Sequence, residues 1–222
     1  MARFFVGLDL GQASDYTALA VLERLSQPGK IEAQYHVRHL ERVRNVPYPD
    51  IVDKIMVMMR SPALGSSAVL VVDQTGVGAP VVDLFRRAHA RLNAVLIHGG
   101  DSETRDGKTW RVPKRNLAGV LQVLFQSGRL KISKKLPLAG TLQAELMNFK
   151  VRIDPVTAHD SYSAWREADH DDLVLATALA CWYAETAAPK PQPRLVFPRA
   201  GPGETITPAW RVHSVIGRTG RF

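Results

Sequence analysis

Two aspartates lie within or directly after strand-like segments. Asp9 is inside the apolar run of residues 3–10, where aspartate is disfavoured and an ionised carboxylate needs a partner. Asp73 directly follows the apolar run of residues 69–72, and the carboxyl ends of strands are where α/β proteins place their sites. A turn-forming role for Asp73 is equally open, whereas local structure alone does not explain Asp9.

Two further aspartates, Asp171 and Asp172, directly precede a third rigid element. The segment 173–182 is apolar almost throughout, which predicts a buried helix. The two acids could complement the positive end of the helix dipole, or they could join Asp9 and Asp73 in one site. Such carboxylates suit Mg²⁺ or Mn²⁺, and a pair of these ions can activate water and stabilise the leaving oxygen in phosphodiester hydrolysis.

Basic residues are concentrated in one internal stretch and at the C-terminus. The whole chain carries a net charge of +8, with 29 basic and 21 acidic residues. Residues 105–135 hold nine basic residues and one acid, and residues 189–222 hold six and one. This segregation is typical of a protein that holds a polyanion beside an acidic site, although a solvated basic face is the simpler interpretation.

The apolar patterns predict an α/β fold. We expect a mixed five-stranded sheet whose first three strands are antiparallel, flanked by helices on its faces. The expected strands cover residues 3–10, 17–25, 31–40, 68–72 and 94–97, and the expected helices cover residues 50–60, 80–92, 113–126, 136–149 and 171–185.

Length and composition limit the domain organisation. The 222 residues, 45% of them hydrophobic, suffice for one packed domain. We expect this domain to cover residues 1–188 and a tail rich in proline, glycine and basic residues to cover 189–222. The single cysteine, Cys181, excludes an internal disulfide and a zinc ribbon, and no apolar run is long enough to span a membrane. We therefore expect a soluble, cytoplasmic protein without membrane partners.

Four motifs in this order resemble the ribonuclease H-like nuclease domain of the large terminase subunit of tailed bacteriophages. The resemblance runs from about Phe4 to Glu185. Its motifs are GLDLG at residues 7–11 with DYTA at 15–18, VDQTGVG at 72–78, VPKR at 112–115 and HDDLV at 170–174.

The resemblance implies a metal-dependent DNA endonuclease that cuts concatemeric phage DNA during genome packaging. Its catalytic and metal-binding residues would be Asp9, Asp73, and Asp171 or Asp172, with two Mg²⁺ or Mn²⁺ ions per site. Asp172 has a small preference over Asp171, because an acid directly before a similar helix occurs in related resolvases. His170 could contact the metal or the scissile phosphate, although a capping role is the simpler interpretation.

The same resemblance implies a set of DNA contacts and partners. Lys114 and Arg115, at the start of a predicted helix, could grip phosphate, and residues 99–110 resemble the variable hairpin or loop near the active site of these nucleases. The expected DNA-binding residues are Lys114, Arg115, Arg111, Lys108 and Arg105. Double-stranded DNA, the portal protein, the small terminase subunit and an ATPase domain are the expected partners, in the host cytoplasm. No G-x-x-x-x-G-K-[ST] motif is present, so no motor activity is assigned to this chain.

Three other functions fit parts of the pattern. A structure-specific resolvase of the same fold would use similar carboxylates. An actin-like or sugar-kinase-type ATP-binding domain also has a G-x-D-x-G first strand, and its second phosphate loop would correspond to residues 73–78. A DNA-binding scaffold with purely structural carboxylates is the third.

Overall fold

The computed structural model describes residues 3–12, 15–26, 32–152 and 170–187. The expected tail and its boundary near residue 188 lie outside the described residues and stay predictions. Among the described residues, no helix combines the length and apolar character needed to cross a bilayer.

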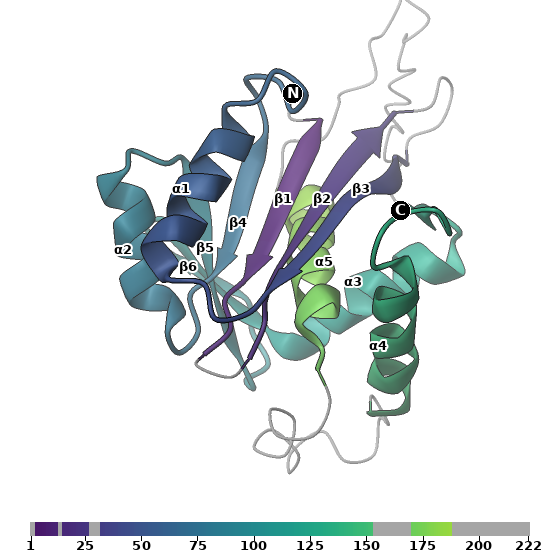
Figure 1. The fold of residues 1–222 in the computed structure, drawn as a ribbon. Coiled ribbons are helices and arrows are strands. Elements are labelled where there is room, and N and C mark those ends of the chain that lie inside the picture. Colours follow the sequence, from purple (N-terminus) through teal and green to yellow (C-terminus); the bar gives the residue numbers. More distant parts are fainter. Residues whose placement is uncertain (1–2, 13–14, 27–31, 153–169, 188–222) are drawn as a thin grey trace, which may run out of the picture. The chain divides into compact units, whose positions relative to one another are not determined.

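The chain forms one mixed sheet with helices on both faces (Figure 1). Its strand order is β6-β7-β5-β4-β1-β2-β3-β8. β1, β2 and β3 are antiparallel neighbours, whereas β4 and β5 run parallel to β1. The strands are β1 (Phe4–Asp9), β2 (Thr17–Leu25), β3 (Gln34–Val43), β4 (Val69–Asp73), β5 (Leu92–His98), β6 (Thr104–Asp106), β7 (Thr109–Pro113) and β8 (Leu130–Ile132).

The mixed α/β fold with an antiparallel first half is confirmed, but the predicted count of five strands is wrong. The five predicted strands are β1 to β5, and β6, β7 and β8 extend the two edges. β6 and β8 have only three residues each, and all of β6 is exposed. β6 is polar throughout, and β8, although its Leu-Lys-Ile sequence alternates, is too short for its pattern to predict a strand.

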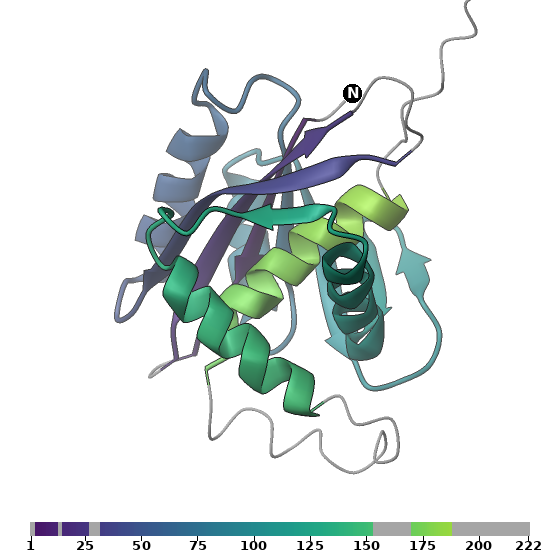
Figure 2. The ribbon, with the colours of Figure 1, turned by 90° about the vertical axis from the view of Figure 1, so that its right-hand side faces the viewer.

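The helices form two layers, one on each face of the sheet. α1 and α2 cover one face, and α3, α4 and α5 cover the other (Figures 1 and 2). The helices are α1 (Tyr48–Met59), α2 (Gly78–Arg87), α3 (Lys114–Gln126), α4 (Ala139–Arg152) and α5 (Asp172–Trp182), and α5 continues as a π-helical turn over Tyr183–Ala187. The helix predicted over residues 80–92 begins at Gly78 and ends at Arg87, since His89 has a left-handed φ of 57° and β5 already starts at Leu92.

Side-chain alternation along β1 decides which face Asp9 joins. Val6 and Leu8 pack in the core beneath α1 and α2, whereas Phe5 packs in the core beneath α5. Because successive side chains of a strand point to opposite faces, Gly7 and Asp9 share the α5 face with Phe5. A Cβ atom on Gly7 would overlap the backbone carbonyl oxygen of Ala176, so glycine is required for α5 to lie this close to the sheet.

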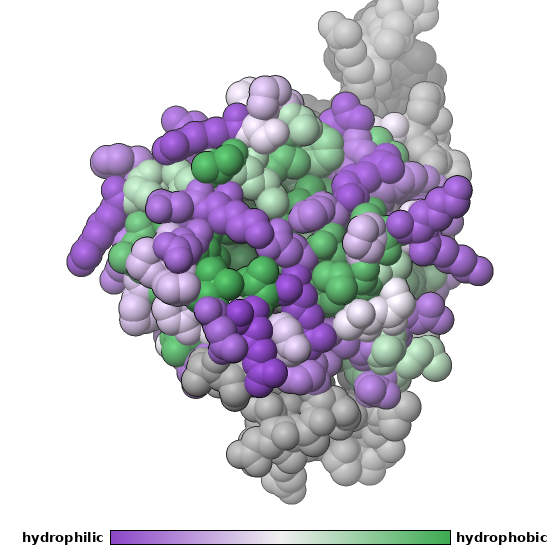
Figure 3. All heavy atoms as spheres, in the orientation of Figure 1, coloured by the Kyte–Doolittle hydropathy of each residue, from purple (hydrophilic) through white to green (hydrophobic). Residues whose placement is uncertain are grey.

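Hydrophobic side chains are mostly internal to these two layers. On the face drawn in Figure 3, polar side chains separate the apolar patches. α5 is the most deeply covered helix, since all of its residues except Leu175 are buried. The predicted buried helix that begins at the paired aspartates is therefore confirmed.

Candidate active site

Asp9 and Asp73 end two adjacent parallel strands. Leu8 of β1 pairs with Val72 of β4. The next residues, Asp9 and Asp73, therefore lie side by side at the carboxyl ends of these two strands. Their relative exposures are 8% and 7%, and the two carboxyl groups share a hydrogen bond. The structure therefore brings together the two aspartates that the sequence singles out on strands.

The turn after β4 fixes the Asp73 side chain. The Thr75 backbone N–H donates to Asp73 Oδ1 at 2.7 Å, and the Thr75 hydroxyl accepts from the Ile97 backbone N–H at 2.9 Å. Gly76 has a φ of 63°, a left-handed conformation that favours glycine. A Cβ atom on Gly78 would overlap the Asp73 carbonyl oxygen, so the glycines of this segment allow α2 to begin directly behind the carboxylate.

The start of α5 carries the other two aspartates to the same face. Asp171 is the N-cap residue and Asp172 is the first residue of the helix. Asp171 Oδ2 lies 3.7 Å from Lys114 Nζ, and Asp172 Oδ2 lies 2.8 Å from Arg42 Nη2. Each α5 carboxylate is therefore next to a cation from another element.

The four aspartates interact electrostatically. Burial, and then the negative charges of Asp73, Asp172 and Asp171, raise the pKa of Asp9 well above its usual range. Burial also raises the pKa values of Asp171 and Asp172, which Lys114 and Arg42 respectively oppose. The charge of Asp172 acts on Asp9 more strongly than that of Asp171, which favours Asp172 as the nearer partner.

A hard divalent cation fits this donor set. The negative charges of the neighbouring aspartates disfavour the ionised form of Asp9 and raise its pKa. A bound divalent cation would instead favour the ionised form. Within the described residues, no three acidic, histidine or cysteine side chains are already arranged as a metal site. Two of the four aspartates contact Arg42 and Lys114 instead, so a metal at this place would compete with protein cations for Asp171 and Asp172.

The expected DNA-binding residues divide into two groups. Lys114, at the first position of α3, lies beside Asp171 and so belongs to the carboxylate cluster. Arg115 instead donates to the Asp101 side chain and backbone, on the surface. The structure therefore does not bring Arg115 to the carboxylates.

The remaining three basic residues lie on the β6–β7 hairpin. Arg105 stacks over the Trp110 ring, 4.7 Å from its centroid, whereas Lys108 and Arg111 are exposed. This hairpin occupies much of the segment that was expected to form a hairpin or loop.

His170 lies at the edge of the cluster. Its Nδ1 is 3.7 Å from Asp172 Oδ2, and its ring meets the Tyr16 ring edge-on with centroids 5.1 Å apart. His170 is therefore in contact with Asp172 and Tyr16 at the edge of the cluster.

Sequence reasoning missed Arg42 and Glu145. Arg42, the penultimate residue of β3, donates to Asp172, while Glu145 of α4 accepts backbone N–H bonds from Leu173 and Val174 at 2.9 and 3.1 Å. Burial raises the pKa of Glu145 to about 7. The only signal in the sequence is a lone acid in a helical segment, which usually marks an exposed face.

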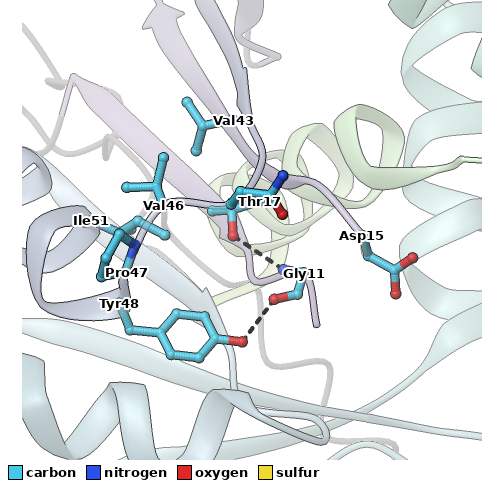
Figure 4. A pocket seen from close by; sticks show the side chains of 9 residues that line it. Gly11, Asp15, Thr17, Val43, Val46, Pro47, Tyr48 and Ile51 are labelled. Atoms are coloured by element: carbon cyan, nitrogen blue, oxygen red, sulfur yellow. Dashed lines mark hydrogen bonds between the residues drawn. The ribbon is translucent and has the colours of Figure 1, made fainter. Parts of the chain in front are cut away.

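A shallow pocket lies beside the chain segment that leaves β1. Gly11 and Thr17 line it on one side and Tyr48 on the other (Figure 4). The Tyr48 hydroxyl donates to the Gly11 carbonyl oxygen at 2.8 Å, and the Gly11 N–H donates to the Thr17 hydroxyl at 3.2 Å. These bonds brace the backbone directly after Asp9, which makes their role structural.

Comparison with known proteins gives a family and a fold. The family model described as the terminase RNase H-like domain matches residues 6–183. The large terminase nuclease of the thermophilic phage G20c has 20% identity and a TM-score of 0.53 over 83% of this chain and 82% of that chain. The same nuclease with bound magnesium has 20% identity and a TM-score of 0.54 over 81% of this chain and 80% of that chain. With bound zinc, it has 21% identity and a TM-score of 0.53 over 83% of this chain and 81% of that chain.

At these identities the solved structures show the fold alone, and they confirm the expected ribonuclease H-like architecture. No curated protein matches the chain in sequence.

Proposed function

The chain belongs to the family of terminase RNase H-like domains, and from this premise we propose that it is a DNA endonuclease that depends on a divalent metal. One observation carries the proposal: the carboxylates of Asp9 and Asp73 meet at the ends of adjacent strands, and the start of α5 adds Asp171 and Asp172. Four acids on three rigid elements are costly to hold together, and Lys114 and Arg42 offset the charges of Asp171 and Asp172 only in part, since the pKa values of both aspartates stay raised.

We assign Asp9, Asp73 and Asp172 as the direct metal ligands, with Asp171 beside them. Solved structures of the similar phage nuclease contain magnesium or zinc, which supports a divalent ion here. When bound, Mg²⁺ or Mn²⁺ ions would activate water and stabilise the leaving oxygen of the phosphodiester.

The chain's own residues orient the donors and the substrate. The Thr75 N–H orients the Asp73 carboxylate, which also shares a hydrogen bond with Asp9. Lys114, beside Asp171, adds a positive charge where a phosphate would approach, and the exposed hairpin residues Lys108 and Arg111 extend that charge away from the site.

The proposal extends to a role in packaging phage DNA. We infer double-stranded concatemeric phage DNA as substrate, with the portal protein, the small terminase subunit and an ATPase domain as partners in the host cytoplasm. Family membership supports this over the sugar-kinase-type alternative. A resolvase-type nuclease would share the fold and differ in substrate, so the substrate must be tested directly.

Cleavage of supercoiled plasmid tests the proposal. We expect the purified chain to nick and linearise plasmid with Mn²⁺, and Asp9→Asn to abolish cleavage. Asp53→Asn, at an exposed position on α1, is the matched control and should cleave like the wild type. Intact plasmid with both Mg²⁺ and Mn²⁺ would contradict the proposal, and cleavage confined to four-way junctions would replace it with the resolvase function.

A further inference from the structure

Three side chains form a chain of charges from α4 through β3 to α5. Arg42 Nη2 donates to Asp172 Oδ2 at 2.8 Å, and Arg42 Nη1 lies 3.6 Å from Glu145 Oε1. One guanidinium thus lies between the aspartate assigned to the metal site and a buried glutamate that is not part of that site.

The sheet register dictates the position of Arg42. Asp9 pairs with Ala18 of β2, and Ala18 pairs with Arg42 of β3, so all three lie in one row across the sheet and on one face. Ala18 is fully buried and small. The Arg42 side chain can therefore extend over it towards the start of α5.

Arg42 is held at this place by more than one contact. Its side chain is 13% exposed, and its guanidinium lies 3.8 Å from the centroid of the Tyr16 ring. A buried guanidinium is stable only where carboxylates balance its charge. Asp172 and Glu145 both supply that balance.

The two carboxylate oxygens of Glu145 differ in their hydrogen bonding. Its Oε2 accepts both backbone N–H bonds from Leu173 and Val174, at the first turn of α5. Among the residues that the structure describes, its Oε1 is buried with no hydrogen-bond partner, and the Arg42 guanidinium is a neighbouring cation. The geometry therefore offers Arg42 a second carboxylate whose hydrogen-bonding capacity is not used.

We propose that Arg42 is the resident counter-ion of Asp172, that it competes with the divalent metal for this carboxylate, and that Glu145 accepts the guanidinium when the metal binds. Arg42 and Glu145 are then positioning residues that set metal affinity. The inference rests on the proposed function, because it assumes that Asp172 is a metal ligand.

The two substitutions should change metal affinity in opposite directions. Arg42→Gln removes the competitor, so Mn²⁺ should bind about tenfold more tightly, as for the loss of one charge-assisted hydrogen bond. Glu145→Gln keeps an oxygen for the α5 N–H groups but removes the second acceptor, so Arg42 stays on Asp172 and Mn²⁺ should bind several-fold more weakly. A purely structural role for Arg42 predicts weaker Mn²⁺ binding in both variants.

Two controls separate this mechanism from a general effect of charge. Arg44, which lies 5.2 Å from the same Tyr16 ring, gives the matched variant Arg44→Gln with the same loss of charge. We expect its Mn²⁺ affinity to stay within about twofold of the wild type, since a screened charge has a small effect. In the Arg42→Gln background, Glu145→Gln should have little further effect, because its partner is absent.

Isothermal titration of the full chain with Mn²⁺ alone, at pH 8 and without DNA, measures these affinities. Unchanged or weaker binding by Arg42→Gln overturns the inference, as does an equal gain by Arg44→Gln. If Arg42→Gln does not fold, Arg42→Lys replaces it; a lysine cannot bridge both carboxylates, so an affinity about threefold above the wild type is expected and wild-type affinity overturns the inference. A wild-type chain that binds no Mn²⁺ would contradict the proposed function itself.

Discussion

At the scale of single residues, the carboxylate cluster lowers the stability of the metal-free protein. Asp9 is buried beside Asp73, and the charges of both α5 aspartates also raise its pKa. Without a metal, the ionised carboxylates therefore repel one another. Because the pKa of Asp9 is raised on folding, its contribution to stability is present at low pH and is lost as pH rises. The metal-free protein should therefore be less stable in mildly alkaline than in mildly acidic solution.

Asp9→Asn should raise the melting temperature of the metal-free protein at pH 8 while abolishing cleavage. The amide removes the repulsion and can donate to Asp73, and each kcal/mol gained corresponds to about 2–4 °C in a chain of this size. Scanning calorimetry with EDTA measures the shift, with Asp53→Asn as the exposed control. A melting temperature below that of the control would show that the ionised Asp9 is not a source of repulsion.

Glu145 should give a separate pH signature. Burial raises its pKa from 4.5 to about 7, so its stabilising contribution is present below pH 4.5 and is lost as pH rises through 7. Between pH 5 and pH 8, the wild type should lose about 2 to 3 kcal/mol of unfolding free energy relative to Glu145→Gln. Urea unfolding at several pH values measures this difference, and a difference that does not vary with pH would contradict the assignment.

The sequence predicted the aspartates and singled out Lys114, but it gave no indication of Arg42. Asp9 stands out because an acid is unusual inside an apolar strand, whereas Asp73, Asp171 and Asp172 stand out because each lies at the end of a rigid element. Arg42 is polar at the end of a strand, which is ordinary, and its contact with Asp172 spans 130 residues of sequence. Only the register across β1, β2 and β3 brings these groups together.

At the scale of elements, the close approach of α5 to β1 positions the site. α5 lies directly over Gly7, two residues before Asp9 and on the same face. A side chain at position 7 would push α5, and with it Asp171 and Asp172, away from the strand ends. The distance between helix and sheet therefore determines how closely the four aspartates of the proposed metal site lie.

Gly7→Ala should destabilise the fold and reduce cleavage together. Overpacking at a tight contact costs about 1–3 kcal/mol, and here the obstacle is a backbone carbonyl that cannot rotate away. Gly119→Ala on α3 is the control, because open space surrounds that position and alanine favours a helix by about 1 kcal/mol. Urea unfolding and plasmid cleavage should both separate the two variants; equal stability would contradict the close approach.

The long elements could be predicted from sequence and the short ones could not. The five central strands and α1, α3 and α5 have the expected period and length, so their ranges agree with the structure to within a few residues. β8 pairs in parallel with β3, and β6 pairs with β7, through backbone hydrogen bonds. Three residues are too few for a side-chain pattern to indicate such pairing. The edge strands of the sheet therefore could not be predicted from the hydrophobic pattern.

At the scale of the whole molecule, charge separates the site from the surface that would hold DNA. The acids meet at the strand ends, while the basic stretch of residues 105–135 runs through the β6–β7 hairpin, α3 and β8. Within it, Lys114 and Arg115 already contact acids, whereas Lys108 and Arg111 are exposed. The hairpin is therefore the better candidate for phosphate contacts than Arg115.

The double variant Lys108→Ala, Arg111→Ala should lower the salt dependence of DNA binding. If each residue contacts one phosphate, the slope of log affinity against log salt should fall by about two. The control is Arg86→Ala, Arg87→Ala on α2, which removes the same charge from the other face of the sheet. An equal fall in both variants, measured by fluorescence anisotropy with duplex DNA, would mean that only net charge matters.

The central claim is that the strand ends of β1 and β4 and the start of α5 form one divalent metal site. Anomalous diffraction from a crystal soaked in Mn²⁺ tests it most directly, because the ion is located without reference to activity. We predict a manganese peak within about 2.2 Å of carboxylate oxygens of Asp9 and Asp172. Manganese peaks found only at other surface acids, with Arg42 still on Asp172, would contradict the account.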